Sequence, residues 1–142
     1  MTIPSHRDYG LLSLLPVWKL VQILREKEEI LILEKVLFET GSDVIDQQSY
    51  GLLDEVSAVM KKHPELVMVE VAGHTDSVGS TEFNLELSKN RASAVRNYLV
   101  NSGVDKDRMI VEYYGETKPI APNMTEGNRK LNRRVEMRFV WE

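Results

Sequence analysis

The chain has 142 residues, of which 42% are hydrophobic and 28% are charged, and its net charge is −4. This length favours one domain with a real core, and the acidic balance argues weakly against nucleic acid, whose phosphates need a basic excess. The absence of cysteine excludes structural disulfides, thiolate zinc sites and cysteine nucleophiles. The histidines His6, His63 and His74 show no ligand spacing, so we expect neither a metal nor a cofactor.

Residues 1–29 differ from the rest and are predicted to be an amphipathic helical extension, with apolar positions at helical spacing in Val17, Leu20, Val21 and Leu24. We favour a helix that docks on the domain, or on a second copy as a homodimer through residues 11–29. A membrane-surface anchor is less favoured because the polar face is not strongly basic. The run lacks a clear signal-peptide cleavage site, so membrane attachment is expected only through parts outside this sequence.

The elements that follow alternate between strand and helix. Residues 30–38 are rich in branched and aromatic side chains and predict a first strand. A helix follows with an apolar face between Leu52 and Met60, and Pro64 ends it. Residues 66–72 are nearly all apolar, which is typical of a central strand covered on both faces, and Gly73 ends that strand.

The second half continues the same pattern. A helix is predicted over residues 82–102 and a third strand over residues 109–114. Residues 116–132 are polar and contain two prolines, which indicates a long loop. Val135 to Trp141 alternate between apolar and charged side chains as in a half-exposed last strand.

This order predicts an α+β fold over residues 30–142, a βαβαββ-type two-layer sandwich. The sheet is expected to be mixed, with both helices on one face, and the N-terminal helix is extra.

Asp76 and Arg91 form the most informative pair. Asp76 follows the apolar strand, and Arg91 lies on the apolar stripe of the next helix, four residues from both Leu87 and Val95. A buried arginine must be paired or reach a groove, because an unpaired buried charge is very costly. Two interpretations remain open: a structural Arg–Asp bridge, or a site for a ligand that carries both an ammonium and a carboxylate.

Polar residues surround this pair. Asn84, Ser77, Ser80 and Thr81 are placed to cap the helix, and a helix N-terminus also favours an anionic group. No serine or threonine has a recognisable His–Asp partner set. The basic C-terminal run around Arg129 to Arg134 is interpreted as polar anchoring around the site, ahead of a solvated edge or a nucleic-acid patch.

Four ordered blocks resemble the OmpA-like peptidoglycan-binding domain over about residues 30–140. They are Val36 to Ser42, Val71 to Gly79, Asn84 to Ala92 and Gly127 to Glu136. The resemblance implies a module that binds the meso-diaminopimelate of the peptidoglycan stem peptide without making or breaking a bond. It also implies a periplasmic location, at the outer membrane and cell wall, and an anchoring role for an envelope protein.

The resemblance also implies a site. Asp76 would hold the diaminopimelate ammonium and Arg91 its carboxylate through a two-pronged bond. Ligand-binding positions also fall on Thr75, Asn84, Thr40, Gly41, Arg133 and Arg134. Some family members carry asparagine where this chain has Gly41, and Asn128 alters the usual Gly-Arg step.

Two alternative hypotheses place the protein in other functional classes. One is a structural or engineered scaffold of the same fold whose N-terminal helix drives self-association. The other is a small enzyme with Asp76 as its base, and this reading is the weakest because no second catalytic group stands out.

Overall fold

The computed structural model describes residues 30–34, 38 and 41–141. The elements in chain order are β1 Ile30–Glu34, the 3-10 turn η2 Gln47–Ser49, α2 Tyr50–Lys62, β2 Leu66–His74, α3 Thr81–Asn101, the 3-10 turn η3 Lys106–Arg108, β3 Met109–Tyr113, α4 Glu126–Asn132 and β4 Arg134–Trp141.

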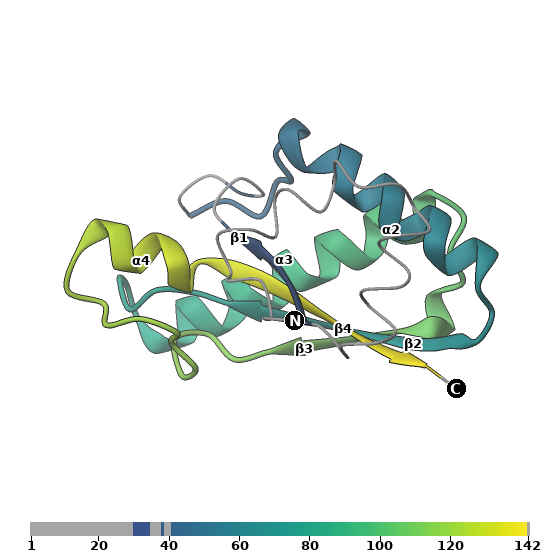
Figure 1. Cartoon of the computed structure of the whole chain (residues 1–142). Coiled ribbons are helices and arrows are strands. Elements are labelled where there is room, and N and C mark those ends of the chain that lie inside the picture. Colours follow the sequence, from purple (N-terminus) through teal and green to yellow (C-terminus); the bar gives the residue numbers. More distant parts are fainter. Residues whose placement is uncertain (1–29, 35–37, 39–40, 142) are drawn as a thin grey trace, which may run out of the picture.

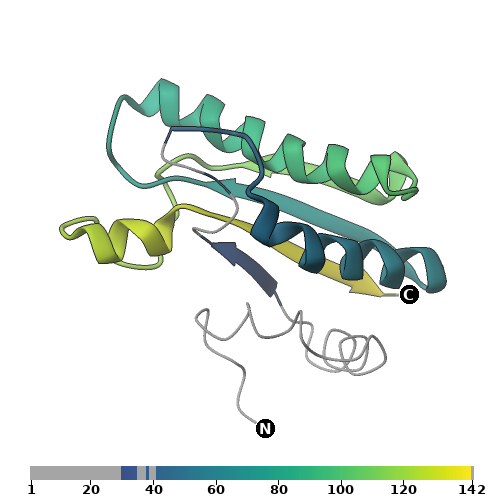
Figure 2. The same cartoon turned by 90° about the horizontal axis from the view of Figure 1, so that it is seen from above.

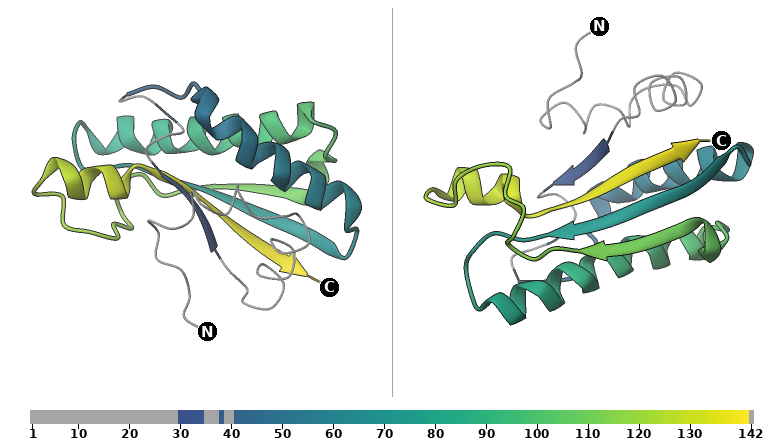
Figure 3. Two further views of the ribbon diagram at one scale, coloured as in Figure 1. Left: turned by 45° about the horizontal axis from the view of Figure 1, so that its top comes forward. Right: turned by 90° about the horizontal axis from the view of Figure 1, so that it is seen from below.

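The strands form one mixed sheet in the order β1-β4-β2-β3. β2 pairs in parallel with β3, while β4 lies antiparallel to both β2 and β1. Helices α2 and α3 cover one face of this sheet (Figure 1). Seen from below, the strands lie in front of these helices (Figure 3). The predicted α+β fold with a mixed sheet and helices on one face is therefore confirmed.

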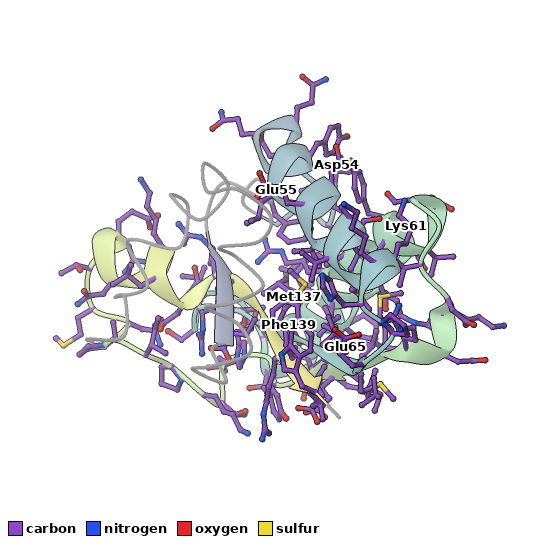
Figure 4. The ribbon with its side chains drawn as sticks, turned by 45° about the vertical axis from the view of Figure 1, so that its right-hand side comes forward. Asp54, Glu55, Lys61, Glu65, Met137 and Phe139 are labelled. Carbon is purple, nitrogen blue, oxygen red and sulfur yellow. The ribbon has the colours of Figure 1, made fainter. Side chains whose placement is uncertain are left out.

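The core lies between the sheet and the two long helices. β4 supplies Met137 and Phe139, which lie under α2 in Figure 4, and both are almost fully buried. Helix α2 contributes its predicted apolar face, and β2 contributes alternate side chains such as Val69 and Val71. Among the described residues, no helix is long and apolar enough to cross a membrane.

The first strand is described over Ile30–Glu34, residues 35–37 lie outside the described residues, and Phe38 forms an isolated bridge with Ile45. Two boundaries differ from the sequence prediction. β2 runs through Gly73 to His74, because Gly73 pairs with both neighbouring strands. The predicted loop 116–132 contains the short helix α4, which Thr125 caps by accepting a bond from the Asn128 N–H. The N-terminal helix of residues 1–29 lies outside the described residues.

Gly73 lets α3 approach the sheet closely. A Cβ at this position would lie 2.0 Å from the Ser88 carbonyl oxygen, well inside van der Waals contact. Ser88 in turn accepts a 3.0 Å bond from the Gly115 N–H and is fully buried. The helix backbone therefore rests directly on the end of β2, at the end of the molecule where α4 also lies (Figure 2).

This close approach predicts that Gly73→Ala destabilises the domain by about 3 kcal/mol, because the methyl group must push the α3 backbone away from β2. Gly51→Ala is the matched control, since Gly51 is exposed in α2 and a Cβ there meets nothing within 4 Å. That control should gain about 0.5–1 kcal/mol from helix propensity. Urea unfolding measures both. Equal midpoints for the two variants would contradict the close contact.

Candidate ligand-binding site

Asp76 lies two residues after β2 and is 7% exposed. Its Oδ1 accepts a 3.0 Å bond from the Val78 N–H, and its Oδ2 accepts a 2.6 Å bond from Arg133 Nη1. The acid is therefore held in a fixed orientation by one backbone donor and one guanidinium. The salt bridge of Asp76 is with Arg133, so the simple Asp76–Arg91 bridge considered from the sequence is not formed.

Arg91 is 2% exposed and belongs to the side of α3 that faces the core, as its position on the stripe predicted. Its Nε donates to the Ser42 carbonyl at 3.0 Å, and its guanidinium lies 5.1 Å from the centre of the Phe38 ring. Burial, then repulsion from Arg133, lowers the pKa of Arg91 to about 10, while Asp76 and Asp43 act in the opposite direction. The side chain remains a cation at neutral pH.

Asp76 and Arg91 line the same cavity of about 320 Å³, between the end of β2, the start of α3 and α4. The cavity is lined by Gly41, Thr75, Asp76, Val78, Gly79, Phe83, Asn84, Leu87, Arg91, Glu126, Arg129 and Arg133. An acid and a buried arginine in one cavity of this size can hold the two charges of a zwitterion.

Thr75 and Asn84 hold the backbone of the acid. Thr75 Oγ1 donates to the Asp76 carbonyl at 2.8 Å, and Asn84 Nδ2 donates to the same oxygen at 3.2 Å. Both side chains are almost fully buried. Ser80 caps α3 by accepting a 3.1 Å bond from the Phe83 N–H, as the sequence indicated. The loop between β2 and α3 is therefore fixed around Asp76.

Helix α4 adds a set of charges to the cavity. Arg133, at its end, bridges Asp76 and Glu126, with a 2.5 Å bond from Nη2 to Glu126 Oε1. Burial alone would lower the pKa of Arg133, but its bonds to Glu126 and Asp76 outweigh this and raise it. The bond from Arg133 lowers the pKa of Glu126. Arg129 contacts Glu126 from one turn away, with Nε 3.3 Å from Oε2.

Arg134 lies apart from the cavity. Its Nε donates to Glu136 at 2.7 Å and its Nη2 to the Lys118 carbonyl at 2.9 Å. Burial alone would raise the pKa of Glu136, but contacts with His74 and Arg134 outweigh it and lower that pKa to about 2. Of the predicted arginine pair, only Arg133 lines the cavity, and Arg134 ties β4 to the loop before α4.

The rim after the first strand is described only in part. Gly41 lines the cavity with φ of 69°, and a Cβ there would meet nothing within 4 Å. Thr40 lies outside the described residues. In the described part of the chain, no group of three or more His, Cys, Asp or Glu side chains is arranged to hold a metal ion.

Sequence reasoning did not assign Glu126, Val78, Gly79, Phe83 and Leu87 to the site, and it placed Arg129 there only as part of the basic run expected to anchor the site. Glu126 and Arg129 were predicted to lie in a loop, although Thr125 before Glu126 is a signal for a helix start. Phe83 is 52% exposed and Val78 is 62% exposed, so they form an apolar edge of the cavity that resembles ordinary surface in the sequence.

Comparison with known proteins identifies the family to which this chain belongs. Residues 37–133 match the OmpA family model, so the chain belongs to the OmpA family. It is 43% identical over 101 residues to outer membrane porin F of Pseudomonas fluorescens, covering 71% of this chain and 31% of that protein. The chain thus spans about a third of the length of that relative.

Solved structures agree with this assignment. The periplasmic domain of Helicobacter pylori MotB superposes with a TM-score of 0.70 at 34% identity, covering 80% of this chain and 76% of that one. The peptidoglycan-associated lipoprotein of Burkholderia pseudomallei superposes with a TM-score of 0.71 at 32% identity, covering 75% and 90% respectively.

The burial of Arg91 predicts that this residue lowers stability in the free protein. Because its pKa is lower in the folded chain, the charged form is better solvated in the unfolded one, and Arg91→Met should raise the free energy of unfolding by about 1 kcal/mol. Lys89→Met, two residues earlier on an exposed position, should stay within about 0.5 kcal/mol. Urea unfolding at pH 7 compares them. A clear loss of stability in Arg91→Met would show that the arginine is retained for the fold.

Proposed function

We propose that this domain binds peptidoglycan non-covalently through the meso-diaminopimelate of its stem peptide, and so anchors an envelope protein to the cell wall. The observation that carries the proposal is the pairing of buried Asp76 and buried Arg91 in one cavity. Membership of a family that includes a protein named peptidoglycan-associated lipoprotein supports the choice of ligand.

The side chain of diaminopimelate ends in a carbon that carries an ammonium and a carboxylate, so its two charges lie one bond from the same atom. In the proposed complex, Asp76 accepts hydrogen bonds from the ammonium. A carboxylate oxygen can accept more than one bond, so Asp76 can hold the ammonium beside Arg133. Arg91 binds the carboxylate, and its desolvation strengthens that bond.

The other predicted ligand-binding residues differ in how directly they act on the ligand in this proposal. Thr75 and Asn84 keep Asp76 in place through its carbonyl. Arg133 sets the orientation of the Asp76 carboxylate. Gly41 leaves space at the rim, and Thr40 remains a predicted contact. Arg134 acts on the fold of the β4 end and is not assigned a contact with the ligand.

We place this activity in the periplasm, at the outer membrane and cell wall. Support comes from the names of the relatives, an outer membrane porin and a periplasmic domain of MotB. The proposal is for binding without turnover, because both carboxylate oxygens of Asp76 already accept hydrogen bonds, one from the Val78 N–H and one from Arg133.

The test is calorimetric titration of a muropeptide that contains meso-diaminopimelate. Asp76→Asn and Arg91→Gln should each weaken binding by about 100-fold, because each leaves one ligand charge without its partner. Arg138→Gln is the control, since Arg138 is 62% exposed, does not line the cavity, and has its ion pair within the described part of the chain with Glu70 at 3.7 Å.

The control should bind as the wild type does, which separates loss of the Arg91 contact from loss of one positive charge. A muropeptide with lysine in place of diaminopimelate lacks the terminal carboxylate and should also bind about 100-fold more weakly. Equal affinity of wild type, Asp76→Asn and Arg91→Gln for the diaminopimelate ligand would overturn the proposal.

A further inference from the structure

Arg129 presents unused hydrogen-bond donors to the cavity. Its Nε lies 3.3 Å from Glu126 Oε2, and its Nη1 donates to the Asn123 carbonyl at 3.2 Å. Among the residues that the structure describes, its Nη2 has no hydrogen-bond acceptor. The side chain is 26% exposed and lines the cavity, so a ligand can reach that nitrogen.

The charges on the cavity wall leave a positive excess on the α4 side. Two acids, Asp76 and Glu126, line the cavity with three arginines, Arg91, Arg129 and Arg133. Arg133 bridges both acids and Arg129 also contacts Glu126, so these five side chains together carry one net positive charge. Two further acids lie nearby on the α3 side: Asp43 faces Arg91, and Glu116 contacts Asn84 at 3.4 Å, so neither is a partner of Arg129.

A ligand with one ammonium and one carboxylate has no net charge, so the net positive charge of the five cavity side chains would remain after it binds. A second carboxylate on the same ligand would meet the unused Nη2 donors and offset that charge.

We propose that the site recognises a second ligand carboxylate through Arg129, and that its preferred ligand is a stem peptide that ends at diaminopimelate. This inference rests on the proposed function and narrows its ligand. Diaminopimelate has a second carboxyl group at the end that belongs to the peptide backbone. That group is charged only when no further residue is attached, because a peptide bond converts it to a neutral amide.

The site thus distinguishes trimmed stem peptides from those that continue beyond diaminopimelate. The class of reaction that must supply its ligand is hydrolysis of the peptide bond on the carboxyl side of diaminopimelate. Asp76 and Arg91 bind the charged groups at the side-chain end of diaminopimelate, and Arg129 binds the carboxylate at its backbone end.

The experiment compares two synthetic tripeptides of alanine, γ-linked glutamate and meso-diaminopimelate. One has its backbone carboxylate free, and the other carries an amide there, so they differ by one charge. With the full chain, we expect the free carboxylate to bind about tenfold more tightly, as suits a partly exposed charged hydrogen bond. In Arg129→Gln, the two tripeptides should bind within about twofold of each other.

Lys130→Gln is the matched control, because Lys130 is exposed on the same helix and does not line the cavity. It should keep the tenfold preference, which separates a contact with Arg129 from the general field of α4. A tetrapeptide that ends in alanine is a third ligand and should bind like the amide. If it binds as tightly as the tripeptide with the free carboxylate, the proposed recognition of the backbone carboxylate of diaminopimelate is overturned.

Failure of this inference differs from failure of the proposed function. If the two tripeptides bind the wild type equally but both lose affinity in Asp76→Asn, the diaminopimelate site stands and the role of Arg129 is wrong. If neither tripeptide binds the wild type, the proposed function itself is overturned.

Discussion

The contact between the backbone of α3 and the end of β2 at Gly73 positions everything else in the site. Because residue 73 has no side chain, the helix lies directly on the strand, and Ser88 also binds the Gly115 N–H. One turn further along the same helix, Arg91 is buried beside the loop that carries Asp76. Asp76 and Arg91, fifteen residues apart in sequence, are thereby brought into one cavity, while Asp76 forms its salt bridge with Arg133.

Arg133 explains why the cavity remains open to a ligand. It forms the salt bridge with Asp76 and also bonds Glu126 on α4. Arg91 keeps its charge but is held by the Ser42 carbonyl and by contact with the Phe38 ring. Burial of its charged guanidinium lowers the free energy of unfolding, and a bound ligand carboxylate would offset that loss. The free domain is therefore less stable because of a residue that binds the ligand.

Much of the fold follows from patterning, and the exceptions have physical causes. Helical spacing of apolar residues predicted the two long helices, alternation predicted the last strand, and branched or continuous apolar runs predicted the first and the central strand. α4 was missed since only Leu131 among its residues is strongly apolar, and its stability comes from a cap and ion pairs. The stripe position of Arg91 revealed its burial, whereas the Asp76–Arg133 pair spans 57 residues and has no local signal. Spacing alone left a structural bridge and a zwitterion site as alternatives, and the resemblance to the OmpA family favoured the site and implied diaminopimelate as its ligand.

The central claim is that Asp76 holds the ammonium and Arg91 the carboxylate at the side-chain end of diaminopimelate. A crystal structure of the domain with a meso-diaminopimelate tripeptide tests it most directly. The account predicts the ligand in the cavity between β2, α3 and α4, with its ammonium nitrogen about 2.8 Å from an Asp76 oxygen and its carboxylate on Arg91. A ligand seated on another face, or one whose charged end points away from this pair, would contradict it.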